Sequence, residues 1–131
     1  MTSFHFNHLA LAVKDVDASI AFYKDIFGFK EIENTASNSK TRWLSINESK
    51  ELHLIPRPEA KIQLVKEVHF AFTTKDIHLF ATHLSNLRIP YYDWLEEADK
   101  IHIRKDGFKQ LYFQDPNGYW IEVNNVNIPT K

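Results

Sequence analysis

The sequence predicts an α+β fold made of two copies of one unit, in which a strand and a helix precede about three further strands. The first observation is an internal repeat, since four residues of the first half recur 61 positions later. The second is alternation of apolar with small or polar residues at the start of each copy, which is typical of a strand. The third is helical spacing of apolar residues directly after it. The repeated residues are His8, Ala10, Lys14 and Asp15, matched by His69, Ala71, Lys75 and Asp76.

The first copy is predicted to contain one strand, one helix and three shorter strands. Residues 7–13 alternate, and Asp15 directly after them is a residue type that caps helices. An apolar stripe at helical spacing follows, and Gly28 is suited to end the helix. The stripe consists of Ala18, Phe22 and Ile26, with Tyr23 and Phe27 beside it. The further strands are predicted at residues 30–34, 41–47 and 51–55.

The second copy repeats this plan after a linker at Pro56 and Pro58, because proline favours extended, unpaired backbone. Residues 68–73 alternate, Asp76 is the predicted helix cap, and Pro90 follows the helix. The sequence Asp-Pro-Asn-Gly at residues 115–118 is a turn signal, so a hairpin closes this half. The helical stripe consists of Phe80, Leu84 and Leu87. The later strands are predicted at residues 91–95, 100–104, 110–114 and 119–124.

Composition limits the classes of function. The 131 residues suit a single domain at 1–131, made of half-modules at about residues 4–58 and 66–128. Sixteen Lys and Arg residues balance seventeen Asp and Glu residues, so no surface for nucleic acid or an anionic membrane is expected. There is no cysteine, which excludes disulfides, thiolate zinc sites and cysteine nucleophiles. The sequence has no signal-peptide pattern and no long apolar stretch, so a soluble cytoplasmic protein is expected.

Strand parity places four polar residues on the sheet faces that point away from the helices. His8 and His69 alternate with bulky apolar residues and share their faces with alanines. His53 and Glu122 are each flanked by two bulky apolar residues, which puts them on the same kind of face. The small residues beside the two repeated histidines leave space for a ligand.

Three histidines and one glutamate at matching positions suggest a divalent metal site. Neutral imidazoles and a carboxylate are common ligands of catalytic metal ions, and they leave coordination positions open. We therefore expect His8, His53, His69 and Glu122 to bind one divalent metal ion, with Zn, Ni, Mn, Fe and Co all compatible. The alternative is an ordinary solvent-facing sheet surface, which alternates in the same way without a function. Recurrence of the pattern in both halves favours the metal site.

Four further side chains are candidate substrate contacts. Trp43, Tyr112 and Trp120 lie on the face opposite the helices and would give an apolar, planar lining for a small-molecule substrate. For Trp43, packing at a dimer interface is an equally good explanation. His102 alternates with isoleucines, so its side chain is also expected on the face opposite the helices.

Three stretches carry a resemblance to a known family: NHLALAV at residues 7–13, ASIAFYKDIFGF at residues 18–29 and FQDPNGYWIEV at residues 113–123. With them the chain resembles, over nearly its whole length, the vicinal oxygen chelate superfamily. That superfamily includes glyoxalase I (a lactoylglutathione lyase), fosfomycin-resistance thiol transferases, bleomycin-resistance proteins and extradiol dioxygenases. The motifs are specific for the superfamily and discriminate poorly between its members.

The resemblance implies two βαβββ modules that form a curled mixed sheet around a metal ion, usually in a homodimer. His8, His69 and Glu122 fall at the family's ligand positions, and His53 falls where glyoxalase I has a ligating glutamate. The implied activity is that of a metal-dependent lyase or isomerase, acting on a small oxygen-chelating substrate through an enediolate that the metal stabilises. Glu122 would be the base that moves a proton between adjacent carbons.

The same resemblance leaves three alternatives open. A fosfomycin-type thiol transferase would have a lysine near Leu95 and a threonine at Ala10, so we rank it below the glyoxalase type. An extradiol dioxygenase commonly has a longer chain with two fused modules. A metal-free binding protein of the bleomycin-resistance type would have vacated ligand positions, whereas here they are filled.

Overall fold

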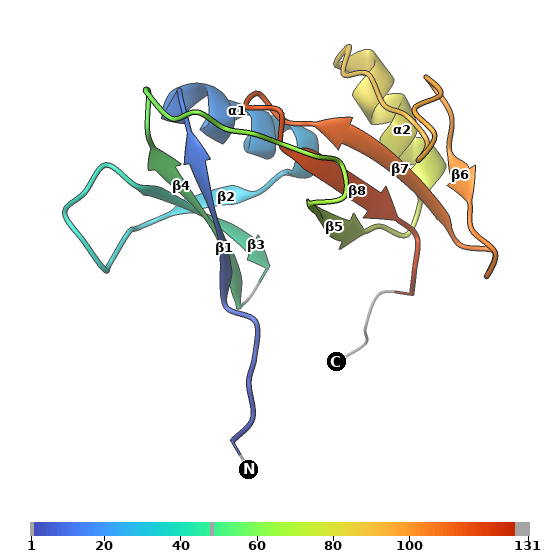
Figure 1. Ribbon diagram of the computed structural model, residues 1–131. Coiled ribbons are helices and arrows are strands. Elements are labelled where there is room, and N and C mark those ends of the chain that lie inside the picture. The colour runs from blue at the N-terminus through green and yellow to red at the C-terminus, as the bar shows by residue number, and fades with distance from the viewer. Residues whose placement is uncertain (1, 48, 128–131) are drawn as a thin grey trace. The chain divides into compact units, whose positions relative to one another are not determined.

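The computed structural model describes residues 2–47 and 49–127, and the chain divides into two compact units, residues 1–62 and 63–131. In its described part, each unit holds one helix and one four-stranded mixed sheet, in the order strand, helix and three strands. Figure 1 shows this order in both units. The predicted α+β fold of tandem βαβββ modules is therefore confirmed. Residue 128, the predicted end of the second half-module, lies outside the described residues.

The first unit contains a sheet in the strand order β1-β4-β3-β2. The parallel pair β1–β4 lies beside the antiparallel pairs β3–β4 and β2–β3. Leu44, Leu52 and Leu54 on this sheet are fully buried. The elements are β1 (His8–Val13), α1 (Val16–Phe27), β2 (Lys30–Ile32), β3 (Arg42–Asn47) and β4 (Lys50–Pro56).

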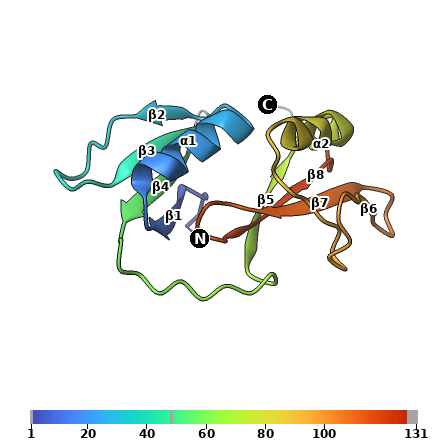
Figure 2. The same ribbon diagram turned by 90° about the horizontal axis from the view of Figure 1, so that it is seen from above.

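Helix α1 begins and ends where the sequence predicts. The Asp15 carboxylate accepts from the backbone N–H of Ala18, and Gly28 takes a left-handed conformation with φ of 72°. The predicted stripe is confirmed at Ile26, and Tyr23 beside it is also buried, but Ala18 is exposed and Phe22 only half-buried. The buried residues are Ser19, Ile20, Tyr23 and Ile26. Seen from above, α1 lies over its sheet (Figure 2), where it contacts β4 and β3. That contact selects the face carrying the fully buried Tyr23 ring.

The second unit repeats the topology, with strand order β5-β8-β7-β6 and a parallel β5–β8 pair. The predicted hairpin turn is confirmed: the Gly118 N–H donates to the Asp115 carbonyl, between the antiparallel strands β7 and β8. Gly118 has φ of 88°, a region that favours glycine. The elements are β5 (His69–Thr73), α2 (Ile77–Asn86), β6 (His102–Ile103), β7 (Lys109–Gln114) and β8 (Trp120–Asn124).

Two predictions in the second unit are wrong. Residues 91–95 form no strand, because only Tyr92 makes isolated bridges there and Asp93 instead accepts from the Glu97 N–H to close a compact loop. The buried face of α2 also differs from the predicted stripe, since Leu87 lies beyond the helix end and is 42% exposed. The buried helical residues are Ile77, Ala81 and Leu84. The strand predicted at residues 100–104 is also shorter in the structure, where it corresponds to β6. The same holds in the first unit for the strand predicted at residues 30–34, which corresponds to β2.

In the described part of the chain, neither helix has the length and apolar character needed to cross a membrane.

An ion-pair network ties α1 to two strands of the first unit. The Arg42 guanidinium donates to both carboxylate oxygens of Glu31, at 2.8 Å each, and also to Asp17. This hydrogen bonding to Arg42 holds the pKa of Glu31 below its ordinary range. A bidentate arginine–carboxylate pair is stronger than a single contact, although exposure to solvent reduces what it contributes.

Replacing Arg42 by Ala is expected to lower the free energy of unfolding by about 1 kcal/mol at neutral pH. Because the folded-state pKa of Glu31 is lowered, its contribution is present at neutral pH and is lost as the pH falls below about 4. The difference between the native and Arg42→Ala proteins should therefore shrink in acid. Urea unfolding at neutral and acidic pH measures both effects. A constant difference across that range would contradict the expectation.

Candidate functional site

Within each unit separately, the pairing of neighbouring strands places equivalent side chains beside one another. In the first unit, His53 pairs with Ala10 on one side and with Trp43 on the other. In the second unit, Glu122 pairs with Ala71 and with Tyr112 in the same way. Residues paired across neighbouring strands project from the same face of the sheet. Each unit therefore presents one set on the face opposite its buried leucine, isoleucine and valine residues: His8, His53 and Trp43 in the first, and His69, Glu122 and Tyr112 in the second.

In the second unit, His69 and Glu122 face each other. The His69 Nε2 lies 3.3 Å from the Glu122 Oε1, and the other ring nitrogen, Nδ1, lies 2.8 Å from the Lys66 carbonyl oxygen. The Glu122 carboxylate is almost buried, at 8% exposure, and both of its oxygens accept hydrogen bonds. Oε1 accepts from the Tyr112 hydroxyl at 2.9 Å, and Oε2 accepts from the Asn124 amide at 2.8 Å. The pair is therefore held in place from several sides.

This arrangement fits the donor set of a divalent metal ion. A carbonyl oxygen only accepts, so His69 Nδ1 must carry the proton that it shares with Lys66. The Nε2 atom then faces a carboxylate oxygen, and two acceptors at this distance require a proton or a metal ion in their vicinity. Ligand atoms at about 2.0–2.2 Å from one metal ion lie about 3 Å apart. A backbone carbonyl on the second nitrogen is also the usual support of a metal-binding histidine.

Tyr112 connects Glu122 to the rest of the sheet. Its hydroxyl accepts from the Gln110 amide at 2.8 Å and donates to Glu122, so the three side chains form a directed chain. Burial and the hydrogen bond to Glu122 raise the pKa of Tyr112 well above its ordinary value. Tyr112 thus stays a neutral phenol and remains a donor to the carboxylate at all ordinary pH values.

Replacing Tyr112 by Phe is expected to cost about 1–3 kcal/mol of unfolding free energy, because a nearly buried carboxylate oxygen loses its donor. The pH dependence should also change. In the native protein the contribution of Tyr112 is present below about pH 10 and is lost as the pH rises, because only the unfolded tyrosine ionises there. The phenylalanine variant should lose stability less steeply in alkali. Urea unfolding at pH values on both sides of 10 tests this, and parallel curves would contradict it.

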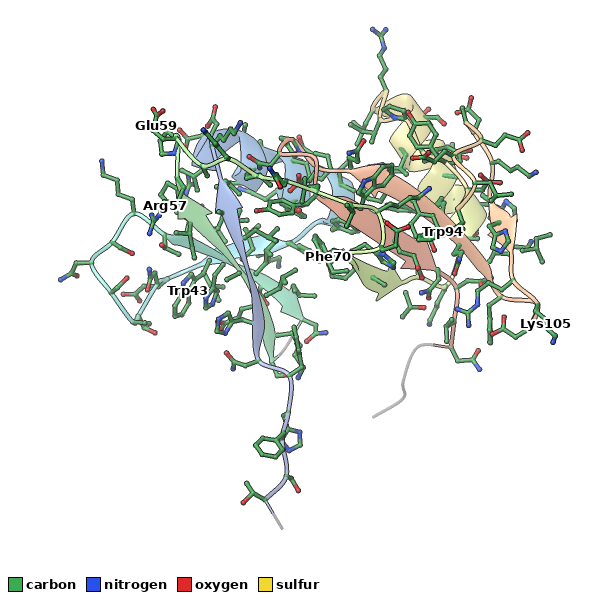
Figure 3. The ribbon with its side chains drawn as sticks, in the orientation of Figure 1. Trp43, Arg57, Glu59, Phe70, Trp94 and Lys105 are labelled. Carbon is green, nitrogen blue, oxygen red and sulfur yellow. The ribbon has the colours of Figure 1, made fainter. Side chains whose placement is uncertain are left out.

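In the first unit, three rings form a stack. The His53 ring lies between His8, at a centroid distance of 4.0 Å, and Trp43, at 4.1 Å. The His53 Nε2 lies 2.9 Å from Glu51 Oε1. Figure 3 shows Trp43 projecting from β3. Glu51 was not among the candidates, although parity could have found it, since it precedes His53 by two residues and pairs in register with His8.

The two histidines of this stack differ from His69 in how they are oriented. The His8 and His53 ring planes are inclined by only 16°, and imidazole lone pairs lie in the ring plane, so the two rings do not converge on one point. His53 would also have to release Glu51 to bind a metal ion through Nε2. Among the four candidate ligands, the observed geometry therefore supports His53 least.

Aromatic side chains of the second unit surround a lysine. The Lys66 ammonium lies 5.0 Å from the ring centroids of Tyr112 and Trp120, and 5.2 Å from that of Trp94. It also donates to the backbone carbonyls of Asp93 and Trp94. Figure 3 labels Trp94 in this region. No sequence pattern indicates Lys66, because it lies in the irregular segment before β5 and its partners come from a loop and two strands.

The remaining candidates are placed as follows. His102 pairs with Gln110, so it lies on the face that also carries Tyr112. The four candidate ligands form two pairs, His8 with His53 and His69 with Glu122, one pair in each unit. Among residues 2–47 and 49–127, no group of three or more His, Asp or Glu side chains has the arrangement of a complete metal site.

Sequence comparison finds relatives with several named activities. The chain is 29% identical over 128 residues to glyoxylase I 4 of Arabidopsis thaliana, a match that covers 92% of this chain and 70% of the relative. It is 32% identical over 132 residues to the metallothiol transferase FosB of Staphylococcus haemolyticus, covering 93% of this chain and 84% of the relative.

Comparison with solved structures supports the fold. The fosfomycin resistance protein FosX of Listeria monocytogenes superimposes with a TM-score of 0.76, covering 97% of each chain at 19% sequence identity. At that identity the likeness concerns the fold alone. Residues 5–123 also match the sequence profile of a single family. The chain therefore belongs to the Glyoxalase/Bleomycin resistance protein/Dioxygenase superfamily.

Proposed function

We propose that this protein is a divalent-metal-dependent enzyme of the glyoxalase type, a lyase or isomerase acting on a small substrate with neighbouring oxygen atoms. His8, His53, His69 and Glu122 are the proposed ligands. The observation that carries the proposal is the His69–Glu122 pair: Nε2 and a carboxylate oxygen 3.3 Å apart, with Nδ1 engaged by a backbone carbonyl. An ordinary solvent-facing sheet surface would not need a histidine and a glutamate in this arrangement.

The chemistry divides between the metal and the chain. When bound, the metal ion would supply electrophilic stabilisation of negative charge on the substrate oxygens. Glu122 would accept a proton from one carbon and return it to the next, which requires a carboxylate within hydrogen-bond range of both. Tyr112 and Asn124, each donating to one Glu122 oxygen, would keep that carboxylate oriented between the two transfers.

The substrate contacts are part of the proposal. Trp43, Tyr112, Trp120 and His102 would line the binding surface, with the tryptophan rings favouring an apolar or planar substrate. In the second unit, however, the faces of Tyr112 and Trp120 are directed at Lys66. We also propose that the protein acts as a cytoplasmic homodimer; light scattering during gel filtration measures its mass directly.

A second candidate function is thiol transfer to an antibiotic of the fosfomycin class. The specific observation that favours it is the identity of 32% to a metallothiol transferase across 84% of that relative's length. Both candidates use a metal ion held by histidine and glutamate, so the donor set does not separate them. This candidate is placed second because Leu95 stands near the position of its lysine and Ala10 stands in place of its threonine.

One experiment tests the proposal and separates the candidates. Protein purified without chelator is analysed for divalent metals and then titrated with Zn²⁺, Mn²⁺, Ni²⁺ and Co²⁺. The metal-loaded protein is next given the hemithioacetal of methylglyoxal and a thiol, and separately fosfomycin with the same thiol. Isomerisation of the hemithioacetal supports the glyoxalase type, and a fosfomycin–thiol adduct supports the transferase. Failure to bind any of the four metals would refute both, and chelator-independent binding of flat aromatics would favour a binding protein.

A further inference from the structure

Lys66 has more partners than an ordinary surface lysine. Three aromatic rings lie within about 6 Å of its ammonium, the range in which cation–π attraction is significant. Two of its N–H groups donate to the carbonyls of Asp93 and Trp94, at 2.9 and 3.0 Å. We call the three rings of Trp94, Tyr112 and Trp120 the aromatic cage. The cage and the two carbonyls hold the far end of the Lys66 side chain.

The near end of the same residue contacts the candidate site. The Lys66 carbonyl accepts from His69 Nδ1. Lys66 lies within a turn that is closed by a hydrogen bond from the Val68 N–H to the Val65 carbonyl. Which imidazole nitrogen carries the proton is set by the hydrogen bond that the other one makes. This carbonyl, 2.8 Å from Nδ1, thus favours the proton on Nδ1 over Nε2, where the Glu122 oxygen at 3.3 Å is the competing acceptor.

We infer that Lys66 is a positioning residue for His69: its caged ammonium fixes the backbone carbonyl that selects the Nδ1–H tautomer and leaves Nε2 available as a ligand. The inference rests on the proposed function, in which His69 binds the metal ion. It also explains why a loop with no regular structure, residues 91–99, carries a buried Asp93 and presents two consecutive carbonyls to one lysine.

The test uses the Zn²⁺-loaded protein labelled with ¹⁵N-histidine. Long-range proton–nitrogen spectra show which ring nitrogen carries the proton, and the His69 signals are assigned by their absence in His69→Gln. The native protein should show the Nδ1–H tautomer. In Lys66→Met it should shift toward the Nε2–H tautomer, and the dissociation constant for Zn²⁺ should rise about tenfold. Lys66→Arg keeps a cation that the aromatic rings attract, so it should restore part of both values.

The control is Lys105→Met, at an exposed lysine in the β6–β7 connection (Figure 3), which should change neither measurement. An unchanged His69 tautomer in folded Lys66→Met would overturn the inference. If that variant does not fold, Trp94→Leu replaces it, because it weakens the cage and leaves the lysine in place; its failure to shift the tautomer counts equally against the inference. Zn²⁺ binding with an unchanged His69 tautomer in Lys66→Met would overturn the positioning role alone, whereas failure of the native protein to bind Zn²⁺ would refute the proposed function and this inference with it.

Discussion

Replacing Glu122 by Gln is expected to reduce the turnover of the metal-loaded protein by about 10²–10⁴-fold, because the amide accepts no proton at its oxygen under these conditions. The substitution keeps the shape of the side chain and one oxygen that accepts from Tyr112. Because Glu122 is a proposed ligand, loss of its negative charge should also weaken metal binding. Steady-state rates with the hemithioacetal, at metal concentrations that saturate each variant, separate the loss of turnover from the loss of affinity.

The matched control for this variant is Glu59→Gln, at an exposed carboxylate in the segment after β4 (Figure 3). It should leave turnover and metal affinity at native values. Glu122→Gln should still fold, with far-ultraviolet circular dichroism like that of the native protein, since most of its contacts survive. Native turnover in a folded, metal-saturated Glu122→Gln protein would remove Glu122 from the proton-transfer step.

The duplicated fold could be predicted from the sequence because a fixed repeat period and alternating strands are local signals. His8 and His69 open β1 and β5, and both of these strands then pair in parallel with the last strand of their own unit. Parity was sufficient to put His53 and Glu122 on the face opposite the core, since a strand exposes alternate residues on alternate faces. The register then showed that they occupy equivalent places, beside Ala10 and Ala71.

The parts that could not be predicted depend on tertiary packing. Three-residue and four-residue spacings in α1 fit two neighbouring stripes, and only the position of the sheet selects the one with Tyr23. Residues 91–95 alternate well enough for a strand, yet the Asp93 carboxylate closes a loop there instead. The contacts of Glu51 with His53 and of Lys66 with the aromatic cage involve side-chain conformations. Alternation along a strand predicts the face on which a side chain lies, but it does not predict which other side chain it contacts there.

Replacing Phe113 by Ala is expected to have the largest effect on stability, a loss of about 3–5 kcal/mol in the free energy of unfolding. Its ring is completely buried on β7 and contacts Phe80 of α2 at a centroid distance of 5.8 Å. Truncation removes apolar surface from the interior and leaves a cavity between helix and sheet. Total stabilities of about 5–15 kcal/mol make such a loss a large fraction of the whole.

Urea unfolding followed by circular dichroism measures the Phe113→Ala effect, and Phe4→Ala is the matched control, since Phe4 is 90% exposed and should cost less than about 0.5 kcal/mol. The same variant also bears on the site. Phe113 and Tyr112 are adjacent on β7 and point to opposite faces, so a cavity under Phe113 lies on the core side of the strand that orients Glu122. We therefore expect Zn²⁺ affinity to fall together with stability. Loss of stability with unchanged affinity would show that the hydrogen bonds of Glu122 hold the site without support from the core beneath it.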